Sequence, residues 1–291
     1  MNGMPNDYWG KYSKSESEES WIRLEDHLVD VAVCFETLLA CGYEKPLSAL
    51  AGVDRLSPEQ ISRLCVIALI HDIGKAIKDF QSQIFEDEKM NKRHTGHTLV
   101  ACSIFKMSPE DKIRKDFLSL FSNFEKWFEY RGCEGDDCFA SMLLNSWGHH
   151  GKPVEYDFAM SPNKGVSGVK WEGWEYLNFN NLIKRIDEII ETYWPESKNS
   201  NDNPIHASSN FMYEFNGLLT LSDWMASDIR YFTYDHDCAS RYIFAKKMAK
   251  KMIKKSGRGK LILENKFENV FGFKRNKMQD NFMEISEKIY A

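Results

Sequence analysis

The sequence lacks the features of secreted and membrane proteins. It has no run of about 20 apolar residues, the length that a membrane-spanning helix needs. Its first 20 residues are polar and acidic, with no apolar segment behind a basic start, which excludes an ordinary secretory signal. The seven cysteines include no CxxC pair, and several lie in helix-like apolar patterns. We therefore expect a soluble, cytoplasmic protein with no membrane partner and with reduced, buried cysteines.

Strand-like sequence is also scarce, and the chain has no internal repeat. The best strand candidate is the short stretch 260–264. Hydrophobic residues make up 43% of the 291 residues, which is enough for a large core and argues against disorder over most of the chain. The length fits one large helical domain, or one domain with an appendage. We expect an all-α fold with little or no β structure.

Net charge limits how the protein could bind nucleic acid. At −5, it argues against a protein that coats nucleic acid by bulk electrostatics, so any such site must be a patch. Residues 241–260 contain nine basic residues and no acidic one, with Phe244, Met248 and Met252 on one face of the implied helix. Two interpretations stay open: a solvated face, which is the usual meaning of such a run, and a stripe that contacts backbone phosphates.

Hydrophobic periodicity places the first two helices. After an expected exposed loop over residues 1–20, apolar residues from Trp21 recur mostly at spacings of three and four, which predicts an amphipathic helix ending near Gly42. The sequence Ser57-Pro58-Glu59-Gln60 has the capping pattern of a helix start. That helix runs through an apolar segment and ends in His71-Asp72.

Three later helices carry further polar residues at their ends. One begins around residues 95–97, a short one over residues 139–147 leads into His149-His150, and one from Phe211 runs into Asp223. Between them, residues 156–174 are rich in glycine and aromatic residues. This stretch is either a flap that contacts substrate or an ordinary insertion.

The His71-Asp72 pair is the first indication of a metal site. Adjacent side chains on a helix point about 100° apart, so a buried imidazole and carboxylate side by side need a shared partner to offset their desolvation. A metal ion is the simplest such partner. A lone His-Asp pair would be better explained as a core histidine followed by a capping aspartate, so the other histidines decide the question.

Most of the histidines fall in one series of candidate ligands. In chain order they are His27, His71, Asp72, His97 or His94, His149, His150 and Asp223. Five imidazoles and two carboxylates are too many for one tetrahedral site, whereas two neighbouring metals bridged by Asp72 would use them all. This donor set suits manganese, iron, cobalt, nickel or zinc better than calcium, and magnesium is less favoured.

Two adjacent metals are suited to phosphoester hydrolysis, because they generate hydroxide and hold the phosphoryl oxygens against it. Lys75 lies four residues after His71 and could stabilise the charge that develops in this reaction. A surface lysine at a helix end is an alternative explanation of Lys75.

The series resembles the HD phosphohydrolase superfamily, and its local motifs resemble the HD nuclease domain of the CRISPR-associated nuclease-helicase of type I systems. The resemblance covers roughly residues 8–230, and the doubled His-His-Gly with the downstream Asp-Trp makes it specific. The matching pieces are Trp9-Gly10-Lys11, Trp21, residues 24–32, residues 68–75 with Phe80-Gln81, residues 147–151, and residues 221–224 with Ser227-Asp228.

The resemblance implies an HD-domain helical bundle with one or two transition-metal ions, which nicks and degrades single-stranded DNA exposed by a crRNA-guided surveillance complex. The ligands it implies are His27, His71, Asp72, His149, His150 and Asp223, and it makes Lys75 a catalytic lysine. His97 fits the helix-starting H-x-x-x-[GA] pattern better than His94 does, and His94 would then support the ligands or contact substrate.

The domain organisation follows from the same resemblance. We expect a polar loop over residues 1–20, the nuclease domain over residues 21–240, and a basic helix and connecting segment over residues 241–291 that would lead into a helicase. Nothing in the sequence matches G-x-x-x-x-G-K-[ST], so the ATP site of a helicase partner must lie elsewhere. Alternatives are an HD phosphohydrolase acting on a nucleotide and a non-catalytic HD interaction module.

Overall fold

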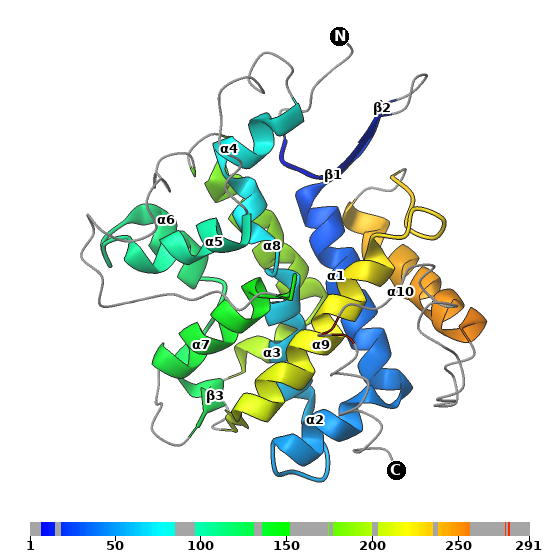
Figure 1. Ribbon diagram of the computed structural model, residues 1–291. Helices are drawn as coiled ribbons and strands as arrows, with labels where there is room; N and C mark the ends of the chain where they lie inside the picture. The colour runs from blue at the N-terminus through cyan, green and yellow to red at the C-terminus, as the bar shows by residue number, and fades with distance from the viewer. Residues whose placement is uncertain are drawn as a thin grey trace.

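The computed structural model describes residues 7–14, 19–84, 97–130, 136–151, 174, 177–199, 203–234, 238–256, 277 and 279. These residues are mainly helical, which confirms the predicted all-α class (Figure 1). His94, the stretch 260–264 and nearly all of residues 156–174 lie outside the described residues. No helix in the described ranges is long and apolar enough to cross a membrane.

The central element is α1 (Leu24–Leu38), which packs most extensively against three other helices. These are α3 (Pro58–Leu69), α9 (Ser209–Ala226) and α10 (Cys238–Lys255). Every residue of α1 except Glu36 is buried, so the helix is enclosed on all sides rather than amphipathic as predicted.

The buried acidic residues of α1 are tolerated because arginines from other elements pair with them. Arg241 of α10 donates to Asp30 at 2.7 Å, and the Nε atom of Arg185 lies 2.8 Å from Glu25. Burial of charge without such a partner would be strongly unfavourable. These pairs join α1 to segments that are distant in the sequence.

Local sequence accounts well for the start of α3. The Ser57 hydroxyl accepts from the Gln60 N–H at 3.2 Å, and the Gln60 side chain accepts from the Ser57 N–H at 2.9 Å, which is the predicted capping box. The end of the helix differs from the prediction. It stops at Leu69, so His71 and Asp72 lie in the turn that follows, before a 3₁₀ helix over Ile73–Ala76.

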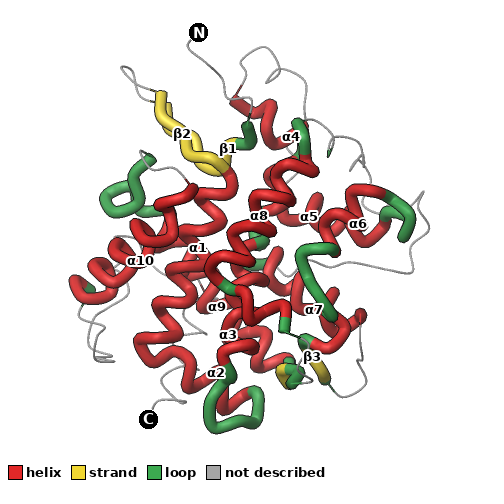
Figure 2. The backbone as a smooth tube through the Cα atoms, turned by 180° about the vertical axis from the view of Figure 1, so that it is seen from behind, coloured by secondary structure: helices red, strands yellow, loops and turns green. Residues whose placement is uncertain are grey.

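The remaining helices surround this core. They are α2 (Glu44–Leu50), α4 (Lys78–Gln81), α5 (His97–Ala101), α6 (Lys112–Leu118), α7 (Asp136–Trp147) and α8 (Phe179–Tyr193). Strands occur only at the periphery of the described fold, as Figure 2 shows in yellow. Short β3 (Phe128–Glu129) pairs in parallel with β4 (Ile205–His206).

A hairpin occupies much of the region expected to be a loop. Strands β1 (Trp9–Lys14) and β2 (Glu19–Arg23) pair antiparallel, so the prediction of an exposed loop over residues 1–20 is wrong for residues 9–14 and 19–20. The physical reason is that Tyr8, Trp9 and Ile22 are buried at the foot of the hairpin. The serine- and glutamate-rich composition concealed these anchors.

Candidate metal centre

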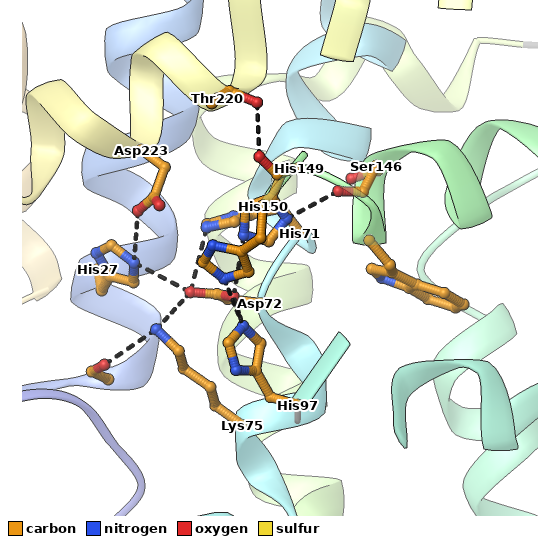
Figure 3. Close-up of polar contacts among 12 residues, drawn as sticks. His27, His71, Asp72, Lys75, His97, Ser146, His149, His150, Thr220 and Asp223 are labelled. Atoms are coloured by element: carbon orange, nitrogen blue, oxygen red, sulfur yellow. Dashed lines mark hydrogen bonds and ion pairs between the residues drawn. The ribbon is translucent and has the colours of Figure 1, made fainter. Parts of the chain in front are cut away.

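Side chains from five segments converge on one point between α1, α3, α5, α7 and α9 (Figure 3). They are His27 on α1, His71 and Asp72 after α3, His97 at the start of α5, His149 and His150 after α7, and Asp223 on α9. All are buried except His97, which is 16% exposed, and His150, which is exposed. The structure therefore brings together all seven residues that the sequence singled out.

The seven residues form two groups that share Asp72. One consists of Asp72, His97, His149 and His150, and the other of His27, His71, Asp72 and Asp223. Within each group the potential ligand atoms all lie within 4.8 Å of one another. Each group thus offers the number and type of donors that one transition-metal ion binds.

The two oxygens of Asp72 face different groups. Oδ1 lies 2.9 Å from His97 Nε2 and 3.5 Å from His149 Nε2. Oδ2 lies 3.2 Å from His27 Nε2 and 3.3 Å from His71 Nε2. This is the placement that a carboxylate bridging two ions requires.

Backbone carbonyls orient two of the imidazoles in the way that metal binding would require. His71 Nδ1 donates to the Ala68 carbonyl and His149 Nδ1 to the Ser146 carbonyl, each at 2.9 Å. These bonds place the proton of each neutral ring on Nδ1 and leave the Nε2 lone pair directed at the cluster. Both Nε2 atoms are buried without a hydrogen bond, as is Asp72 Oδ1. Buried acceptors of this kind need a partner, and a metal ion fits these residues.

Burial keeps His27 and His149 in the neutral state that metal binding requires. Desolvation, followed by the charge of Lys11 and then that of Lys75, lowers the pKa of His27 to about 4. Desolvation, with the neighbouring His71 next, lowers the pKa of His149 to about 3. Imidazoles that are neutral at pH 7 need not release a proton to bind a metal.

The two carboxylates are held in the ionised state. Burial would raise the pKa of Asp72, but the charge of Lys75 and the neighbouring histidines together outweigh this effect, so the pKa lies well below its usual range. The pKa of Asp223 is likewise well below its usual range, because a hydrogen bond from His27 and the charge of Lys11 outweigh its burial. His27 and His149 are thus neutral and Asp72 and Asp223 ionised, which is the state in which each type of side chain binds a metal.

Lys75 lies beside the cluster. Its Nζ is 2.5 Å from Asp72 Oδ2 and donates to the Gly10 carbonyl at 3.3 Å. The side chain is only 8% exposed, so the alternative of an ordinary surface lysine is wrong. The contact with Asp72 holds the Lys75 ammonium at the cluster. A positive charge in this position could stabilise the negative charge that develops in phosphoester hydrolysis.

Strand β1 forms a wall of the site, which sequence reasoning missed. The Gln81 side chain donates to the Trp9 carbonyl at 3.0 Å and to the Lys75 carbonyl at 2.7 Å, and Trp9 Nε1 donates back to the Gln81 carbonyl. Lys11 on the same strand donates to the Ser227 hydroxyl at 2.7 Å. These residues belong to the motifs that carry the family resemblance, but neither their spacing nor the hydrophobic periodicity indicated that they contact one another.

Known proteins match both the sequence and the structure. The family model "Cas3, HD domain" matches residues 9–232. A structure described as "Crystal structure of CRISPR-associated protein" aligns with a TM-score of 0.60 at 16% identity, covering 96% of this chain and 30% of that one. No curated protein matches the chain.

Two further solved structures are similar. T. fusca Cas3 with AMPPNP aligns with a TM-score of 0.55 at 15% identity, over 85% of this chain and 26% of that one. A "CRISPR RNA-guided surveillance complex, pre-nicking" aligns with a TM-score of 0.56 at 14% identity, over 86% and 28%. The chain spans less than a third of the length of these proteins, and at such identities the likeness shows the fold alone. The family match over residues 9–232 establishes more: the chain belongs to the Cas3 HD-domain family.

Proposed function

We propose that this chain is a metal-dependent nuclease that nicks and degrades single-stranded DNA in type I CRISPR interference. The observation that carries the proposal is the position of Asp72, each of whose oxygens faces one group of potential ligands. Phosphodiester hydrolysis is the reaction to which a carboxylate-bridged pair of transition metals is best suited. We further propose that a crRNA-guided surveillance complex recruits the protein and that a helicase domain or subunit works with it.

Each residue of the cluster has a role in the proposal. One ion would be held by His97, His149 and His150, the other by His27, His71 and Asp223, and Asp72 would contact both. The ions would supply a water of lowered pKa and neutralise phosphoryl oxygens. Lys75 remains bound to Asp72 and keeps this carboxylate turned toward both groups. Its ammonium also stabilises charge on the phosphate undergoing hydrolysis.

The exposed face of α10 supports a polymeric substrate over a free nucleotide. It carries a continuous row of exposed lysines, Lys247, Lys250, Lys251, Lys254 and Lys255. The Lys251 and Lys255 ammoniums also lie within 6 Å of the centre of the Tyr231 ring, at 5.8 and 5.9 Å. Lysines clustered on one face release counterions from a nucleic-acid backbone. A free nucleotide has no use for so extended a cationic surface.

Cleavage of circular single-stranded DNA tests the proposal. The purified chain is incubated with the circle and Mn²⁺, Co²⁺, Ni²⁺, Zn²⁺, Fe²⁺ or Mg²⁺, with EDTA as one control and Asp72→Asn as the other. We expect transition-metal-dependent cutting that both controls abolish, and unchanged cutting by Lys45→Gln, whose lysine is exposed on α2. Failure to cut by a protein shown to contain metal would contradict the proposal, and hydrolysis of nucleotides by that protein would support the phosphohydrolase alternative.

A further inference from the structure

A second lysine approaches the candidate metal centre beside Asp223. Lys11 of β1 places its Nζ 3.6 Å from Asp223 Oδ1 and 2.7 Å from the Ser227 hydroxyl. The Ser227 hydroxyl lies 3.2 Å from the same Asp223 oxygen, to which it donates. One hydroxyl therefore accepts from the lysine, donates to the carboxylate, and fixes the position of the ammonium.

The backbone that carries Lys11 is held rigidly against the centre. A Cβ atom on Gly10 would lie 2.9 Å from Leu24 Cα and 3.0 Å from His27 Cβ. Strand β1 therefore contacts α1 at His27, one of the candidate ligands. The preceding residue, Trp9, is locked by its reciprocal hydrogen bonds with Gln81. A side chain built on a fixed strand holds its charge in one place without the entropy cost of ordering a loop.

Lys11 and Lys75 have different surroundings. The Lys75 side chain is 8% exposed and lies 2.5 Å from the Asp72 carboxylate, so its charge is directly neutralised. The Lys11 side chain is 29% exposed, its hydrogen bond goes to a neutral hydroxyl, and its carboxylate contact is the longer one. A lysine ammonium has three N–H donors, and the bond to Ser227 uses one. Lys11 is therefore the more accessible of the two lysines to an incoming anion.

We propose that Lys11 binds a non-bridging phosphate oxygen of the substrate strand, on the Asp223 side of the centre, with Ser227 as its positioning residue. The inference rests on the proposed nuclease function and adds a specific substrate contact to it. Lys75 then orients Asp72 and stabilises charge on the reacting phosphate, while Lys11 holds the backbone of the strand in register with the ligands. A rigid cation beside the reacting phosphate contributes to orientation, which is a large part of catalysis by positioning.

Binding and metal content together test the assignment of Lys11. A fluorescent ten-nucleotide single strand is titrated, in saturating Mn²⁺ and over a series of salt concentrations, into Asp72→Asn and into Asp72→Asn with Lys11→Gln. We expect the added Lys11→Gln change to weaken affinity roughly fivefold to tenfold and to reduce the slope of log K against log salt by about 0.7, the value of one lost phosphate contact on a single strand. Lys45→Gln in the same background is the matched control and should change neither quantity.

The metal content of Lys11→Gln in the otherwise native chain separates a substrate contact from a structural role. We expect it to equal that of the unaltered protein, while KM for the oligonucleotide rises more than kcat falls. Loss of metal would assign Lys11 to holding Asp223 and would overturn the proposal. Equal affinity and equal salt slopes with and without Lys11→Gln would also overturn it. Absence of binding by the Asp72→Asn parent, with no cleavage by the native chain, would instead contradict the nuclease function itself.

Discussion

Substitution of Gly74 by alanine should remove one metal ion and leave the other. A Cβ atom at this position would lie 1.9 Å from the carbonyl oxygen of His97 and 3.1 Å from the amide nitrogen of Ala101, so α5 must move by about 1 Å or more to admit it. His97 is the only ligand candidate on α5, and its Nε2 lies 2.9 Å from Asp72 Oδ1. Metal–ligand distances tolerate about 0.2 Å, so a shift of this size removes His97 from coordination.

The expected magnitudes follow from that displacement. Overpacking should cost about 1–3 kcal/mol of unfolding free energy. A misplacement of about 1 Å at a reacting centre lowers the rate on the order of 100-fold. Loss of a residue that only hydrogen-bonds a metal ligand lowers metal affinity roughly 10–100-fold. Loss of His97 itself should lower the affinity for the ion held by Asp72, His97, His149 and His150 by at least as much. The ion on the His27 side should be retained.

Metal analysis after dialysis, together with thermal unfolding, measures both effects. Gly52→Ala is the control: Gly52 has φ +74° and no atom within 4 Å of an added Cβ, so alanine strains the backbone without touching the centre. We expect two ions per chain in Gly52→Ala and one in Gly74→Ala at comparable stability. Two tightly bound ions in a folded Gly74→Ala protein would refute the argument from close packing.

Three further predictions concern other parts of the chain. His97→Ala should bind one ion fewer and lose cleavage activity, whereas His94→Ala should keep both ions. If metal analysis instead finds one ion fewer in His94→Ala, then His94 is the ligand. Arg241→Met should lower the free energy of unfolding, measured with denaturant, by about 3–5 kcal/mol, because the buried Asp30 carboxyl loses its partner. Burial raises the pKa of Asp30 to about 7 even beside Arg241. Adding Asp30→Leu to Arg241→Met should recover most of the lost stability. Burial raises the pKa of Glu214 from 4.5 to about 7, so this carboxyl costs stability progressively between pH 4.5 and pH 7, and the full cost is present above pH 7. Glu214→Gln should therefore stabilise the protein by about 1–2 kcal/mol more at pH 8.5 than at pH 5.5, and an equal gain at both pH values would contradict this.

The sequence was informative where local chemistry decides the structure. The capping box at Ser57 and Gln60 is a pattern of side-chain and backbone bonds within four residues, and it forms as predicted. The pair His71-Asp72 stood out because it follows an apolar run that had to be buried. Histidines and aspartates near the ends of several helices were enough to predict that these side chains meet at one site. The structure brings them together.

The sequence was uninformative where contacts between distant segments decide. No local feature gives the approach of Gly74 to α5 or of Gly10 to α1, because both depend on how close two backbones come. The sequence also does not indicate that α3 ends at Leu69, since no glycine or proline lies between Leu69 and His71. Lys11 appeared only as part of a motif, and its contacts with Ser227 and Asp223 span more than 200 residues.

Location of the metal ions tests the central claim most directly. Crystals of the chain grown or soaked in Mn²⁺ are measured at the manganese absorption edge, and an anomalous difference map is calculated. We expect two peaks about 3.5–4 Å apart, one on each side of Asp72. Oδ1 should face the ion held by His97, His149 and His150, and Oδ2 the ion held by His27, His71 and Asp223. A single peak, or two peaks that do not share Asp72, would contradict it.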